Sequence, residues 1–211
     1  MASLVNDFGL SGKFGNVIIY RRGNKSYVRR VLQVRNPNTE KQQMVRARFL
    51  VAIKFYQKLK ETSLKRILTV SAQGNSANGY TFYLEKNVKA FCADGHVGDF
   101  SQLQFSAGKR QRVFHLSGTI DLEGRVLLEW KKEGGLGFTE DDDRLVVVVL
   151  NEGRIFCPKV LEDTGAVRKD GVAGFTIDGW EGESLHLYCF FVSPDEKQLS
   201  ESQYVCLQGR I

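Results

Sequence analysis

A run of four acidic residues, Glu140-Asp141-Asp142-Asp143, is the most concentrated group of potential ligands in this chain of 211 residues. Carboxylate oxygens are the ligands that Ca²⁺ prefers, and a calcium site needs several of them to converge. The run lacks the alternating ligand positions of an EF-hand loop, and Arg144 follows it directly. We predict a solvated acidic loop here, and a metal site remains the open alternative.

Catalytic patterns do not emerge from the other reactive side chains. The three histidines show no metal-pair spacing, and the four cysteines form no C-x-x-C pair (His96, His115, His186; Cys92, Cys157, Cys189, Cys206). We interpret the cysteines as reduced, buried small hydrophobic residues. The glycine-containing segments 9–13 and 134–137 fit neither a P-loop nor a dinucleotide fingerprint. The sequence therefore predicts a protein that is not an enzyme and uses no cofactor.

Basic and aromatic residues gather near the N-terminus. The runs GNVIIYRR and KSYVRRVL have the composition of β-strands, and Gly23-Asn24 between them suits a tight turn. We predict a hairpin over residues 14–32. It presents a candidate docking or phosphate-contact surface of Tyr20, Arg21, Arg22, Lys25, Tyr27, Arg29 and Arg30, continued by Arg35. The arginines could contact phosphates and the tyrosines could stack on bases. A solvated hairpin face with its tyrosines packed on a helix is the alternative.

Charge is divided unevenly along the chain. Residues 1–90 hold 17 Lys and Arg against 4 Asp and Glu, a net of +13, whereas residues 91–211 hold 13 against 20, a net of −7. Such a split predicts two functional surfaces. The basic half could face phosphate, an acidic partner, or the acidic half of a neighbouring copy.

Periodicity predicts helices before residue 92 and strands after it. We expect helices over about 40–60 and 63–70, and a third that begins at Asn78 or Gly79 and runs to about residue 91; the first is expected to be buried on more than one side. Eight short β-type runs follow, at 100–106, 112–119, 125–131, 144–151, 154–161, 171–177, 185–192 and 203–209.

These elements predict an α+β protein. A basic hairpin-and-helix segment (residues 1–95) would precede an antiparallel immunoglobulin- or fibronectin-like β-sandwich (residues 96–211), with Trp130 and Trp180 as core anchors. Whether the two parts share one core stays open at this point.

The first sixty residues contain a recognisable signature. It reads Gly12-Lys13-Phe14-Gly15-Asn16, Tyr20-Arg21-Arg22, Ser26-Tyr27-Val28-Arg29, Asn36-Pro37-Asn38-Thr39, Gln42 or Gln43, Arg46 and Phe49. The signature resembles that of an uncharacterised protein family common in Bacteroidota, and a similar N-terminal signature is seen in some phage proteins. The stretch 185–204 resembles the C-terminal end of the same family through His186, Tyr188, Phe191, Ser193, Ser200, Ser202 and Tyr204. One departure is Glu40-Lys41, where the family often has a short apolar pair that includes proline, and it affects only the expected start of the first helix. The resemblance implies no assigned function, and the similar signature in some phage proteins implies a virion setting.

Three functions follow as hypotheses. The first is a structural or assembly protein of a virion or another multi-subunit particle, homo-oligomeric or bound to other subunits, with the basic segment as its docking surface. The second is nucleic-acid binding by the hairpin. The third is a sandwich that binds a carbohydrate or protein ligand through the loop 132–143, which contains Phe138. We expect no membrane segment and no classical signal peptide, and therefore a cytoplasmic or virion location.

Overall fold

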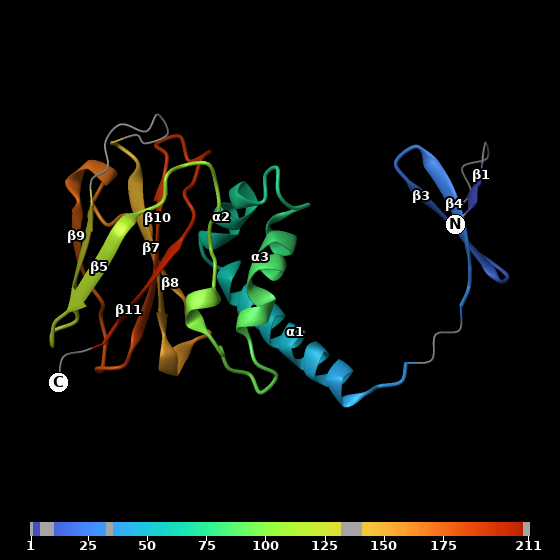
Figure 1. The fold of residues 1–211 in the computed structure, drawn as a ribbon, viewed down its shortest axis with the longest axis horizontal. Helices are drawn as coiled ribbons and strands as arrows, with labels where there is room; N and C mark the ends of the chain where they lie inside the picture. The colour runs from blue at the N-terminus through green and yellow to red at the C-terminus, as the bar shows by residue number, and fades with distance from the viewer. Residues whose placement is uncertain (1, 5–10, 33–35, 132–140, 209–211) are drawn as a thin grey trace. The chain divides into compact units, whose positions relative to one another are not determined.

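The computed structural model describes residues 2–4, 11–32, 36–131 and 141–208, and the chain forms two compact units, Met1–Thr39 and Glu40–Ile211 (Figure 1). The sequence-based division lay near residue 95. In the structure the helices belong with the sandwich, because they share its core, and the N-terminal strands form a unit of their own.

The N-terminal unit is a four-stranded antiparallel sheet. Its strands are β1 (Ala2–Leu4), β2 (Gly12–Phe14), β3 (Val17–Arg22) and β4 (Lys25–Arg30), in the order β1-β4-β3-β2. Strands β3 and β4 are the predicted hairpin. Gly23 turns the chain between them with a φ of 61°, a left-handed conformation that glycine adopts without strain.

Three helices open the second unit: α1 (Glu40–Leu59), α2 (Leu64–Ser71) and α3 (Gly79–Asn87). Their starts were predicted to within one residue. The side chain of Asn78 caps α3 by accepting a hydrogen bond from the Thr81 amide at 2.9 Å. A 3-10 turn, η1 (Val88–Ala90), continues α3.

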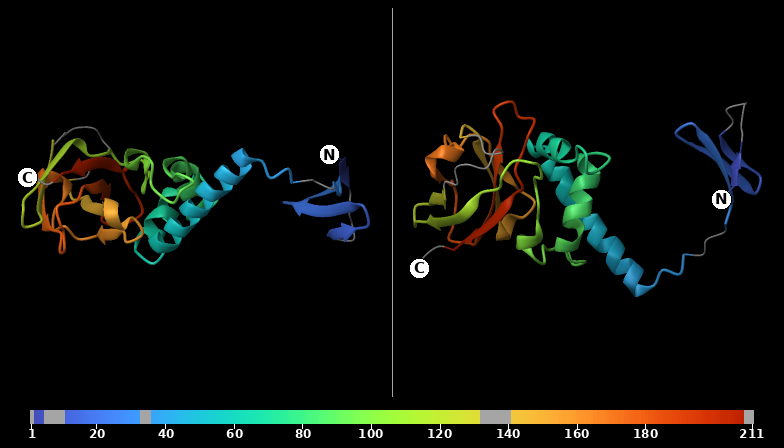
Figure 2. Two further views of the ribbon diagram at one scale, coloured as in Figure 1. Left: turned by 90° about the horizontal axis from the view of Figure 1, so that it is seen from below. Right: turned by 45° about the horizontal axis from the view of Figure 1, so that its top comes forward.

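Only the C-terminal half of α1 lies in the core. Phe55 and Leu59 are fully buried, whereas Met44 is 56% exposed and Val45 is 63% exposed. The prediction that α1 is buried on more than one side is therefore wrong for its first half. The reason is length: about 20 residues span about 30 Å, and the N-terminal half of α1 extends past α3 (Figure 2).

Two antiparallel sheets form the sandwich, as predicted. One has the order β11-β10-β7-β8 and the other β5-β6-β9. Their strands are β5 (Phe114–Ile120), β6 (Arg125–Lys131), β7 (Arg144–Asn151), β8 (Lys159–Leu161), β9 (Val172–Thr176), β10 (Leu185–Val192) and β11 (Gln203–Leu207).

The strand predicted at residues 100–106 is wrong. Phe100–Gln102 is a 3-10 turn, η2, and the residues after it run beside the helices without joining a sheet. Their amide groups bond to side chains instead. The Gln104 amide donates to Asn87 Oδ1 at 2.6 Å, and the Phe105 amide donates to Ser202 Oγ at 3.1 Å. Apolar alternation at Leu103 and Phe105 therefore reflects burial in an extended segment, not a strand. The predicted strand 154–161 is likewise limited to β8, because residues 152–154 form a 3-10 turn, η3.

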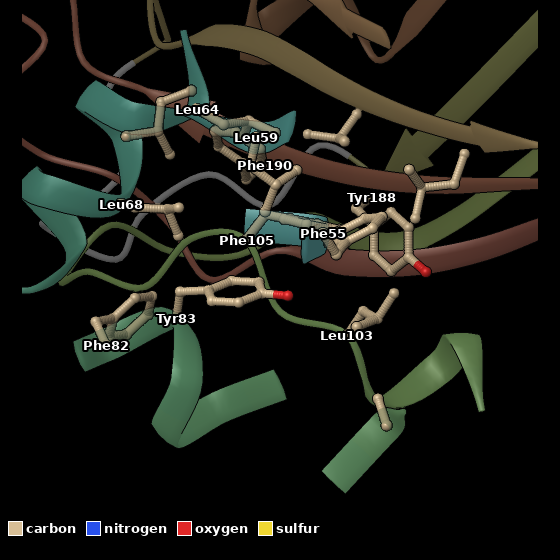
Figure 3. Packing of buried hydrophobic residues seen from close by; sticks show 14 of the residues in the cluster. Phe55, Leu59, Leu64, Leu68, Phe82, Tyr83, Leu103, Phe105, Tyr188 and Phe190 are labelled. Carbon is tan, nitrogen blue, oxygen red and sulfur yellow. The ribbon is translucent and has the colours of Figure 1, made fainter. Parts of the chain in front are cut away.

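Strands β7 and β10 are buried on both faces. On one face, Val146, Val148, Tyr188 and Phe190 pack with Phe55 and the other helix residues (Figure 3). On the other face, Val147, Val149, Leu187 and Phe191 pack with Leu128 and Trp130 of the three-stranded sheet. The second unit is therefore a three-layer stack of helices, four-stranded sheet and three-stranded sheet. The predicted anchor Trp130 is 6% exposed, and Trp180 packs at the edge of the same core.

We predict that Phe190→Ala lowers the free energy of unfolding by about 3–5 kcal/mol, because it opens a cavity between the helices and the sheet. Phe49→Ala is the matched control, since Phe49 is 41% exposed, and should cost less than about 1 kcal/mol. Urea unfolding followed by circular dichroism measures both. Equal losses for the two variants would contradict the assignment of this core.

Candidate functional site

Strand register assigns the predicted surface residues to two opposite faces of the N-terminal sheet. Directly paired residues of an antiparallel sheet point to the same side, and neighbours along a strand point to opposite sides. The pairs Ile18–Arg29, Tyr20–Tyr27 and Arg22–Lys25 therefore share one face, together with Lys13, which pairs with Ile18. We call Lys13, Tyr20, Arg22, Lys25, Tyr27 and Arg29 the cationic face.

Arg21 and Arg30 lie on the opposite face. There they accompany an apolar group formed by Phe14, Val17, Ile19 and Val28. The structure thus brings together five of the predicted residues and separates these two arginines from them. Arg35 lies outside the described residues. Lys13 was not predicted to belong to this surface. It joins the face because β2 pairs with β3, and the predicted hairpin contained only β3 and β4.

Two tyrosines form the centre of the cationic face. The Tyr20 and Tyr27 rings are stacked, with centroids 5.7 Å apart and planes 22° apart. The Arg29 guanidinium lies 5.9 Å from the centroid of the Tyr20 ring, within cation–π range. Both tyrosines are half-buried, whereas Arg22, Lys25 and Arg29 are exposed. The face therefore presents aromatic rings flanked by solvated cations.

The N-terminal unit carries the whole formal net charge of the chain. Residues 1–39 contain 7 Lys and Arg against a single acid, Asp7, a net of +6, and the chain as a whole is also +6. Residues 40–211 hold 23 Lys and Arg against 23 Asp and Glu. No acid occurs between Asp7 and Glu40, so no carboxylate within that stretch can neutralise the cationic face.

Opposite charges meet within the second unit. Arg66 of α2 forms ion pairs with Glu162 at 3.8 Å and with Glu196, which also binds Arg144 at 2.8 Å. These contacts connect the basic helical layer to the acidic sandwich. The excess positive charge of the helices is thus offset by the sandwich on which they pack.

Two members of the acidic run, Asp142 and Asp143, pair with cations of the protein, and the prediction of a solvated loop is wrong for Asp143. Asp143 is fully buried and lies 3.2 Å from the guanidinium of Arg168, which stacks 3.9 Å above the Phe191 ring. Arg110 lies 3.9 Å from the same carboxylate, and exposed Asp142 pairs with Lys169 at 2.9 Å. Glu140 lies outside the described residues. In the ranges described, no three His, Cys, Asp or Glu side chains form a group that could hold a metal ion.

We predict that Asp143→Ala lowers the free energy of unfolding by about 3–5 kcal/mol, because it leaves Arg168 buried without its counter-ion. The control is Asp142→Ala, which breaks only a solvent-exposed pair and should cost less than about 1 kcal/mol. Chemical denaturation of the two variants checks this. Similar stabilities would mean that the buried pair contributes nothing.

His186 lies among aromatic rings at the junction of β10, β11 and η2. The His186 ring stacks on Phe100 with centroids 3.7 Å apart, and its Nδ1 lies 2.9 Å from the Tyr204 hydroxyl. Its Nε2 is buried without a hydrogen-bond partner among the described residues. Burial lowers the pKa of His186, and the nearby Glu152 carboxylate opposes that change. Burial therefore favours the neutral form of His186, whose ring packs on Phe100.

This environment makes stability depend on pH. Because the pKa of His186 is lower in the folded state than its ordinary value near 6.5, the unfolded chain binds the proton first as the pH falls. The stability contributed by neutral His186 is present above about pH 6.5 and is lost as the pH falls toward the folded pKa. We expect the free energy of unfolding to decrease between pH 7 and pH 5, and His186→Phe to reduce that decrease. A pH dependence identical in both proteins would contradict this assignment.

The cysteines differ in exposure, and a polar hollow lies on the surface of the second unit. All four cysteines are free, as expected, but only Cys189 is buried; Cys157 and Cys206 are exposed, so the prediction that all are buried is wrong. A polar hollow of about 970 Å³ contains three lysines, and its acids Glu85 and Glu201 are already bonded to Ser76 and Gln104. The predicted ligand loop 132–143, with Phe138, lies mostly outside the described residues.

These features define a class of protein: a charge-balanced three-layer α+β unit preceded by a small cationic sheet. The chain belongs to a family of unknown function, DUF6266, whose model matches residues 9–206. The match confirms the resemblance to an uncharacterised family. No curated protein matches the chain. In the described ranges, none of the helices has the length and apolar character needed to cross a membrane.

Proposed function

We propose that this chain is a non-catalytic structural or assembly protein that docks onto an anionic component of a larger particle through the cationic face of its N-terminal sheet. The observation that carries the proposal is the concentration of the entire net charge of +6 in residues 1–39. A cationic sheet whose strands contain no acidic residue attracts a partner of opposite charge.

The second unit serves as the scaffold in this proposal. Its core is continuous from the helices through the four-stranded sheet, and its positive and negative charges balance. Because the charges of the second unit balance, a polyanion would bind the N-terminal sheet. The particle that the phage resemblance suggests is a virion.

A second copy of the chain is the partner that the acidic sandwich suggests, since residues 91–211 carry a net charge of −7. Such docking would produce a homo-oligomer that dissociates in salt, because exposed charges are screened. Light scattering after size exclusion at about 50 mM and 500 mM salt separates this case from docking on another component. A monomer at both salt concentrations would exclude self-docking and leave an anionic partner of different composition.

Retention of the full chain on a heparin column tests the docking surface itself. We expect Lys13, Arg22, Lys25 and Arg29→Gln together to abolish retention at about 150 mM salt, because the cationic face then loses its four cations. The matched control removes four exposed lysines from the second unit (Lys54, Lys60, Lys65 and Lys89→Gln), which lowers the net charge equally. Equal weakening in both variants would show that retention follows net charge alone and would reject the proposal.

A further inference from the structure

We propose that the cationic face binds single-stranded nucleic acid, with phosphates against Lys13, Arg22, Lys25 and Arg29 and a base stacked on the Tyr20–Tyr27 pair. This inference rests on the proposed function, since it names the anionic partner of the same face. The inference depends on how the cations and tyrosines are arranged on the sheet, and the net charge does not show that arrangement.

The cations lie on both sides of the aromatic pair. The register gives three successive rows across the sheet: Lys13, Ile18 and Arg29; then Tyr20 and Tyr27; then Arg22 and Lys25. Neighbouring rows on one face are two residues apart along a strand, or about 7 Å. A polyanion that crosses the rows therefore meets positive charge, aromatic surface and positive charge in turn.

The aromatic pair favours nucleic acid over an acidic polypeptide. Carboxylates would use only the cations, whereas a nucleotide offers a phosphate to the cations and a flat base to the rings. The position of Arg29 near the Tyr20 ring supports both contacts at once, because a guanidinium can stack on an aromatic face while it binds a phosphate.

The geometry favours a single strand over a duplex. The tyrosines belong to the sheet surface itself, are half-buried, and stack on each other. Bases inside a duplex are stacked on one another and cannot reach such rings, whereas the bases of a single strand are free to stack on them.

Fluorescence anisotropy of the full chain with a labelled oligothymidylate of about 12 nucleotides tests the inference. A duplex of the same length and a labelled polyglutamate peptide serve as competing probes. We expect the oligothymidylate to bind most tightly, with a slope of log affinity against log salt near about −3, as about four phosphate contacts would give.

Matched pairs of variants test the two kinds of contact separately. Arg22→Gln with Arg29→Gln should weaken binding about 10- to 30-fold and roughly halve the salt slope. Arg21→Gln with Arg30→Gln removes the same charge from the opposite face and should weaken binding less than about threefold.

Tyr20→Leu with Tyr27→Leu should weaken single-strand binding about 5- to 100-fold. Tyr20→Phe with Tyr27→Phe keeps the rings and should have little effect. Circular dichroism confirms that each variant is folded.

The outcomes distinguish this inference from the function on which it rests. Tight binding of polyglutamate that is insensitive to the tyrosine changes would reject nucleic acid and leave docking to an acidic protein intact. Tighter binding of the duplex than of the single strand would also overturn the inference. A protein that binds none of the three probes would reject both proposals.

Discussion

Two neighbouring strands with almost no polar side chains, β7 and β10, impose the main constraint on this molecule. All eight residues of β10 and six of the eight in β7 are buried, so both faces of this strand pair need an apolar cover. The helices supply one cover and the three-stranded sheet supplies the other. This requirement explains why the helices cannot form a domain apart from the sandwich: without them, Val146, Val148 and Phe190 would face water.

The distribution of charged residues follows the same division into helical layer and sandwich. The helical layer contributes positive charge and the sandwich contributes negative charge, and packing one on the other balances the second unit. The ion pairs of Arg66 connect the two layers directly. The strands β1 to β4 of the N-terminal sheet contain no acidic residue. Burial therefore determines the architecture of the body, whereas uncompensated charge distinguishes the sheet that precedes it.

Local patterns allowed much of the fold to be predicted, and non-local pairing accounts for most of what was missed. The bounds of β6, β7 and β10 agree with the predictions to the residue, because alternation or continuous apolar character is visible in a short window. The segment with Leu103 and Phe105 shows the same alternation but bonds to Asn87 and Ser202, residues distant in sequence. The candidate site shows the same limit: the arginines were evident from the sequence, but their division between two faces depends on strand register, and Lys13 joins them only through β2.

The order of elements along the chain bears on how the most apolar segment is protected during synthesis. Leu145–Leu150 is an uncharged, proline-free run of the kind that assembles into intermolecular β-structure when exposed, and its central partner β10 begins about 40 residues later. The helices that cover one of its faces are made earlier, at residues 40–87. Because chains emerge from the N-terminus first, a nascent helical layer is available to shelter β7 before β10 exists. The order of elements along the chain therefore makes the helical layer available to cover one face of β7 before β10 is synthesised.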